Sequence, residues 1–199
     1  MIRYSKPLFA ILPALLISLP TVLTAAESSG ARRAVVADLK KLVAVAQHPE
    51  NAAITRLSRQ FGFNYTAGAC DENPDPWCNF LPRYQGRPAA QFSMIYLGED
   101  RSSGMPVGKL SWDIVDRHVC LTVSEVERFL GRGKPWFGSV NDVFGGASEK
   151  LPVLEEFHYE HIPGVSRKLP TAAGVIAEFQ NKCLSGIRIS VHPRQGSTP

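Results

Sequence analysis

Two stretches between positions 31 and 61 place apolar residues at the spacing of an amphipathic helix. In Ala31–Gln47 apolar side chains recur every three or four residues, and His48-Pro49 ends the pattern. A second helix is predicted over Asn51–Gln60, and Gly62 is the residue expected to end it. The N-terminal part of the chain is therefore predicted to form a helical hairpin or two consecutive packed helices.

Alternation with a period of two then predicts strands. Gln91–Leu97 places Phe92, Met94 and Tyr96 on one side, and residues 109–114 alternate in the same way, so the two runs predict an antiparallel hairpin. Three further strands are predicted around residues 153–159, 175–179 and 183–191. Residues 63–85 and 132–148 are rich in proline or glycine and are predicted to be loops.

Between these strands, Thr122-Val123-Ser124-Glu125 is a capping box that predicts a central helix ending at Gly131. The order of elements favours an α+β domain: an antiparallel sheet of about five strands with two N-terminal helices and one central helix packed on it.

The first residues have the pattern of a secretory signal peptide. Two cations, Arg3 and Lys6, precede an apolar run that ends in small residues, so cleavage is predicted near Ala26. The expected division is a signal peptide over 1–26, one domain over 27–192 and a disordered tail over 193–199. Loss of the leader lowers the formal charge from +4 to +2, which gives no reason to expect nucleic-acid binding. No integral membrane segment is predicted.

Four cysteines remain after cleavage, and an even number in an exported chain indicates two disulfides with three possible pairings. The favoured pairs are Cys70–Cys78, which brackets a proline-rich loop, and Cys120–Cys183, which ties the middle of the chain to its last strand. Zinc ligation by these thiols is the competing interpretation, but no Cys-x-x-Cys motif occurs. A periplasmic or secreted location without metal or cofactor is therefore expected.

Two loops combine cations with large aromatic residues, the residue types that dominate binding hot spots. The candidate binding residues are Arg132, Lys134, Trp136 and Phe137 in the first loop, and Trp77, Arg83 and Tyr84 in the second. The alternative is that these aromatic side chains are buried as part of the core.

The densest titratable cluster is His158-Tyr159-Glu160-His161. On a strand, His158 and Glu160 would point the same way, which is the basis for an alternative function as a small exported hydrolase. The simpler interpretation is the polar outer face of a strand, and the motifs of zinc proteases and serine hydrolases are absent.

The segment Leu121-Thr122-Val123-Ser124-Glu125-Val126-Glu127-Arg128-Phe129-Leu130-Gly131, followed by Glu156-Phe157-His158-Tyr159, resembles one unit of a periplasmic module. That module occurs in outer-membrane-assembly lipoproteins and, duplicated, in the β-lactamase inhibitory protein. The resemblance implies that such an architecture can bind proteins. The leading expectation is an exported, non-catalytic inhibitor or immunity protein whose partner is a toxin or an enzyme that acts on the cell envelope. An envelope assembly or structural factor is a further alternative.

Overall fold

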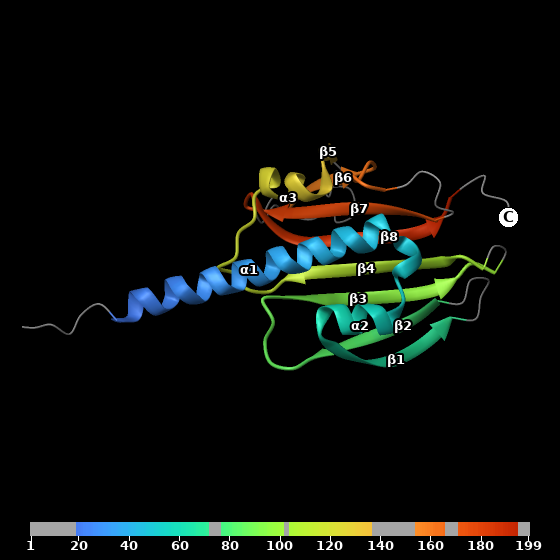
Figure 1. Cartoon of the computed structure of the whole chain (residues 1–199), viewed down its shortest axis with the longest axis horizontal. Helices are drawn as coiled ribbons and strands as arrows, with labels where there is room; N and C mark the ends of the chain where they lie inside the picture. The colour runs from blue at the N-terminus through green and yellow to red at the C-terminus, as the bar shows by residue number, and fades with distance from the viewer. Residues whose placement is uncertain (1–18, 72–76, 102–103, 137–153, 166–170, 195–199) are drawn as a thin grey trace, which may run out of the picture.

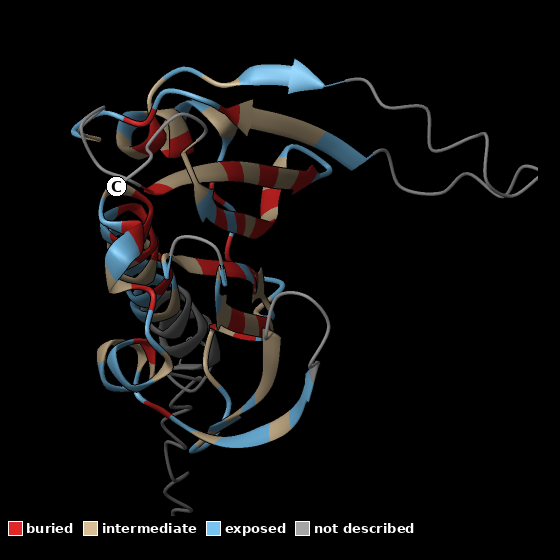
Figure 2. Cartoon of the chain, turned by 90° about the vertical axis from the view of Figure 1, so that its right-hand side faces the viewer, coloured by how far each residue is buried: buried red, intermediate tan, exposed pale blue. Residues whose placement is uncertain are grey.

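The structure, a computed structural model, describes residues 19–71, 77–101, 104–136, 154–165 and 171–194. Within these ranges the chain forms an eight-stranded antiparallel sheet and three α-helices. The helices all lie on one face of the sheet, on the left in Figure 2, and no described helix covers the opposite face. This helix-free face is where the candidate site lies.

The helices are α1 (Leu19–Gln47), the short 3-10 helix η1 (Pro49–Asn51), α2 (Ile54–Phe61) and α3 (Val123–Leu130). The strands are β1 (Phe63–Asp71), β2 (Trp77–Tyr84), β3 (Ala90–Glu99), β4 (Pro106–Ile114), β5 (Lys134–Trp136), β6 (Leu154–Tyr159), β7 (Thr171–Gln180) and β8 (Cys183–Pro193). The α+β class predicted from the sequence is thus confirmed.

The sheet consists of two four-stranded meanders that meet at their last strands, in the order β1-β2-β3-β4-β8-β7-β6-β5. Helices α1 and α2 precede the first meander, and α3 precedes the second (Figure 1). The two halves of the molecule therefore repeat one order of elements, although no sequence repeat indicated it.

The hydrophobic core lies between the helices and one face of the sheet. Helix α1 packs on β7 and against α3, α2 packs on β1, and α3 packs on β8. Buried side chains of the helices meet buried side chains of the central strands, among them Leu39 and Leu42 from α1 and Phe92, Trp112 and Phe179 from β3, β4 and β7. Because each strand buries alternate residues, the other half of its side chains faces away from the helices.

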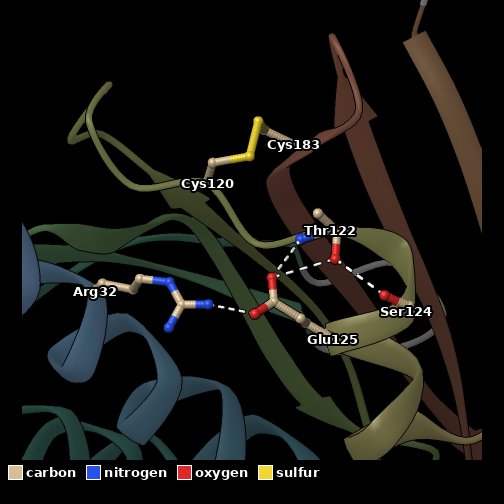
Figure 3. Close-up of a disulfide and its surroundings, with 6 residues drawn as sticks. All are labelled: Arg32, Cys120, Thr122, Ser124, Glu125 and Cys183. Atoms are coloured by element: carbon tan, nitrogen blue, oxygen red, sulfur yellow. Dashed lines mark hydrogen bonds and ion pairs between the residues drawn. A yellow bond between two sulfur atoms is a disulfide. The ribbon is translucent and has the colours of Figure 1, made fainter.

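The start of α3 and the end of α2 follow the sequence signals, whereas α1 begins at Leu19, before the predicted Ala31, and α2 begins at Ile54, after the predicted Asn51. Gly62 ends α2 with a positive φ of 69°, a left-handed conformation that glycine adopts without strain. At the start of α3 the predicted capping box is formed, since the Glu125 carboxylate accepts a hydrogen bond from the Thr122 backbone N–H at 3.0 Å. Glu125 also binds Arg32 of α1, so the cap joins two helices (Figure 3).

Both predicted disulfides are present. Cys70 and Cys78 are directly opposite each other on β1 and β2, and Cys120–Cys183 fastens the segment before α3 to the start of β8. Two disulfides fit an exported protein. None of the helices in the described ranges is long and apolar enough to cross a membrane.

The prediction of about five strands was too low. Residues 63–85, predicted to be a loop, hold β1 and β2, and the short strand β5 lies in the segment 132–148 that was predicted to be irregular. Strand β1 contains small residues and a bulge between Ala67 and Cys70, and β5 has a central proline, so neither shows a regular alternation.

A second correction concerns β3. Phe92, Met94 and Tyr96 were predicted to share one side, but a register shift between Phe92 and Met94 separates them. Phe92 is 2% exposed in the core, whereas Met94 and Tyr96 are half-buried on the helix-free face. A single extra residue reverses which face every later side chain occupies.

The proposed ends of the domain stay predictions. Helix α1 is described from Leu19, and β8 is described to Pro193, one residue beyond the predicted domain limit. Residues 1–18 and 195–199 lie outside the described ranges.

Candidate binding face

The strand register defines which side chains lie on the helix-free face. On β4 and β8, Leu110 and Ile189 are paired and buried toward the helices. Their neighbours Ser111 and Arg188 are also paired and therefore point the opposite way. Following such pairs across the sheet gives two rows of side chains on this face: Met94, Ser111, Arg188, Ile176, His158 and Lys134, and beside it Gln91, Asp113, Gly186, Glu178, Glu156 and Trp136.

Large apolar side chains are unusually exposed on this face. In the described ranges the exposed large hydrophobic residues are Leu81 (52%), Val115 (46%), Trp136 (53%) and Leu154 (42%). Trp136 and Leu154 lie on the helix-free face by register, and Leu81 alternates with Phe80 and Pro82, which face the core side of β2. Three of the four thus lie on the helix-free face: Trp136 and Leu154 are on the neighbouring strands β5 and β6, whereas Leu81 is on β2, near the other edge of the sheet. An exposed apolar pair of this kind is a candidate contact point for a partner.

The candidate binding residues divide between the two faces. Lys134 and Trp136 on β5, and Trp77 and Arg83 on β2, point away from the helices. Arg132 is exposed in the segment between α3 and β5. Phe137 lies outside the described residues.

Tyr84 is on the core side of β2. Its ring lies 5.5 Å from that of Phe63, and its hydroxyl accepts a hydrogen bond from the Phe92 backbone N–H at 2.8 Å. Burial raises the pKa of Tyr84 to about 12. This side chain therefore supports the packing of β2 on β3 and is not part of the helix-free face.

An ion-pair network crosses β6, β7 and β8 on the helix-free face. The Arg188 Nη2 atom lies 2.6 Å from the Glu156 Oε1 atom, and Arg188 Nε pairs with Glu178. One guanidinium thus bridges carboxylates on two neighbouring strands, a geometry that fixes all three side chains. Sequence reasoning missed Arg188 and Glu178 because only the strand pairing brings them to Glu156.

His158 and Glu160 each interact with residues of this face other than one another. His158 Nε2 lies 3.6 Å from the Glu156 Oε2 atom, and its ring stacks on Trp136 with the centroids 5.6 Å apart. Strand β6 ends at Tyr159, and Glu160 beyond it pairs with Lys134 at 2.8 Å. The hydrogen bond and charge of Lys134 lower the pKa of Glu160, which keeps that carboxylate ionised.

Within the described ranges no three His, Cys, Asp or Glu side chains converge as a metal site would require. Comparisons of the chain with protein-family models, with curated proteins and with solved structures gave no match. The resemblance of residues 121–131 and 156–159 to the periplasmic module therefore stays a prediction.

Proposed function

We propose that this is an exported protein without catalytic activity that binds another protein through its helix-free face. The most concrete form is an inhibitor or immunity protein that blocks a toxin or an enzyme acting on the cell envelope. The observation that carries the proposal is that Trp136, Leu154 and Leu81, three of the four large apolar residues that are exposed in the described part of the chain, lie on this face.

The scaffold suits such a role. Binding costs less free energy when the contact residues are already ordered, because fewer side chains and strands lose freedom on association. Here the sheet is continuous, helices brace its other face, and each meander carries a disulfide. The repeated order of helix and four-stranded meander also supports the architecture that the sequence resemblance suggests.

The proposal is tested by recovering the partner from cells that make the protein. The mature chain is tagged, expressed from its own promoter and cross-linked in the cell, and the co-purified proteins are quantified. We expect one stoichiometric partner whose recovery falls at least about tenfold in the double variant Trp136→Ala/Leu154→Ser, since truncated hot spots typically cost 2 kcal/mol or more. The partner's enzymatic activity should fall when the purified protein is added.

Val115→Ser is the matched control. Val115 is similarly exposed, at 46%, but it lies beyond the end of β4, in a hollow lined by Ala31 and Ala34 of α1. Its substitution should leave recovery unchanged. Absence of a partner, or equal losses in the control and the double variant, would contradict the proposal. Hydrolytic activity that disappears in His158→Ala would favour the hydrolase instead, and cofractionation with outer membrane would favour an assembly factor.

A further inference from the structure

A hollow of about 740 Å³ lies on the helix-free face of the first meander. Its walls are mostly apolar: Trp77, Met94 and Tyr96 are half-buried there, and Asn79 and Lys109 supply polar groups. Ala69 and Cys70 complete the lining. The hollow spans all four strands of the meander, because these residues come from β1, β2, β3 and β4.

The wall on the β1 side is fixed by two features of the backbone. The bulge between Ala67 and Cys70 places two residues, Gly68 and Ala69, opposite Asn79, which brings Ala69 to the rim. The disulfide Cys70–Cys78 then joins β1 to β2 beside Trp77. A pocket whose walls are held in this way is preorganised for a ligand group.

Among the described residues that line the hollow, Lys109 is the one with a charged side chain. Its ammonium lies 5.9 Å from the centre of the Trp77 ring, within the range of a cation–π contact. Among the described residues no carboxylate lies within ion-pair distance of it, whereas Arg188 and Lys134 of the second meander are both paired with glutamates. The first meander thus presents a cation against aromatic walls without a counter-charge from the described part of the chain.

We propose that this hollow receives an acidic side chain of the protein partner together with an adjacent aromatic or aliphatic side chain. The inference rests on the proposed function and specifies the chemistry of the partner. The carboxylate would pair with the Lys109 ammonium and accept a hydrogen bond from the Asn79 amide, while the apolar side chain would cover Met94 and Tyr96. A charge-assisted hydrogen bond beside apolar walls is stronger than the same contact in open water.

The test uses small probes and does not need the partner. Blocked dipeptides of sequence Glu-Phe, Gln-Phe and Lys-Phe, acetylated and amidated at their ends, are titrated into the isotope-labelled mature protein. The three tryptophans are separate reporters in an NMR nitrogen–proton spectrum: Trp77 lines the hollow, Trp136 lies on β5, and Trp112 is 1% exposed in the core. We expect Glu-Phe to move the indole resonance of Trp77 and to leave those of Trp112 and Trp136 in place.

Glu-Phe should bind at least about fivefold more tightly than Gln-Phe, which corresponds to roughly 1 kcal/mol for the added charge. Lys109→Ala should remove this preference, and Lys109→Arg should retain it. An unchanged Trp112 resonance in each variant would show that the fold is intact.

Equal affinity for Glu-Phe and Gln-Phe, or a stronger response to Lys-Phe, would overturn the inference. The two proposals fail separately. A partner whose recovery depends on Trp136 but not on Lys109 would contradict only this inference. Dipeptide binding in the absence of any partner would contradict the proposed function and would leave only the ligand preference of the hollow.

Discussion

The two meanders share an order of elements but differ in how their outer faces are stabilised. In the second meander, β5–β8, Arg188 joins Glu156 to Glu178, and Lys134 pairs with Glu160. In the first, β1–β4, no described carboxylate pairs with Arg83 or Lys109, and a hollow separates the strands' side chains. Within the described residues, the second face therefore pairs these charges internally, whereas the first leaves Arg83 and Lys109 without a paired carboxylate.

The same contrast applies to the disulfides and the helix starts. Cys120–Cys183 links residues 63 apart and anchors α3 to the sheet, whereas Cys70–Cys78 links residues eight apart within one pair of strands. Helix α3 has a complete capping box, but Ala53 at the start of α2 makes no side-chain cap. The second meander thus carries the disulfide that closes the longer loop and follows the helix with the complete cap.

The largest expected effect comes from the long disulfide. Cys120→Ser/Cys183→Ser should lower the free energy of unfolding by about 4 kcal/mol, because the loop it closes in the unfolded chain is long. Cys70→Ser/Cys78→Ser should cost less, about 2.5 kcal/mol by the same chain-entropy relation. Urea unfolding of the oxidised parent and both double variants measures the difference. Equal losses would show that the two halves are stabilised alike.

Two substitutions, each of which removes one positive charge, test the comparison of the two faces. Arg188→Ala should cost about 1–2 kcal/mol, since it leaves Glu156 and Glu178 without their shared cation; their side chains are only 16% and 22% exposed. Lys109→Ala should change stability by less than about 0.5 kcal/mol, as expected for an unpaired surface residue. Thermal and urea unfolding of the two variants provide the test. A comparable loss in Lys109→Ala would mean that this lysine has a structural partner and is not held ready for binding.

The sequence predicted well the features that are determined by residues close together along the chain. The sequence predicted the capping box at Thr122 and the helix end at Gly62 because both are marked by local motifs. It predicted both disulfides because four cysteines allow three pairings only. The exposed cations and tryptophans of the candidate site were likewise visible as residue types.

The sequence did not predict the features that depend on how the strands pair with one another. The shift at Ser93 places Met94 and Tyr96 on the opposite side of β3 from Phe92, with which they were predicted to share a side, and no propensity marks it. Strand β1 is paired on one side only and half-exposed, so its hydrophobic pattern is weak. Arg188 reaches Glu156 only once β6, β7 and β8 are in register, and the hollow forms only once β1 to β4 are.

Substitutions at the starts of α3 and α2 should change the free energy of unfolding by moderate amounts of opposite sign. Thr122→Ala should destabilise the protein by about 1 kcal/mol, because the hydroxyl and the ordered Glu125 carboxylate satisfy backbone donors of α3. Ala53→Ser should stabilise it by about 0.5–1 kcal/mol, because Ala53 already has the extended backbone of a capping residue, φ −89° and ψ 140°. Chemical unfolding measures both changes. If Ala53→Ser gave no gain, the start of α2 would already be satisfied by other contacts.

The smallest effect is a pH dependence at the contact between α1 and α3. The hydrogen bond from the Thr122 backbone N–H, followed by the charge of Arg32, lowers the pKa of Glu125 below its ordinary value. The stabilisation is therefore fully present above the unfolded pKa of about 4.3 and is lost as the pH falls through the lower folded value. Unfolding curves recorded between pH 6 and pH 3 should consequently converge for the parent and Glu125→Gln, with the parent more stable only at the upper end. Curves that stay parallel over this range would mean that the ionised carboxylate does not stabilise the α1–α3 contact, and the strength of the second meander would then have to come from its disulfide and its Arg188 network alone.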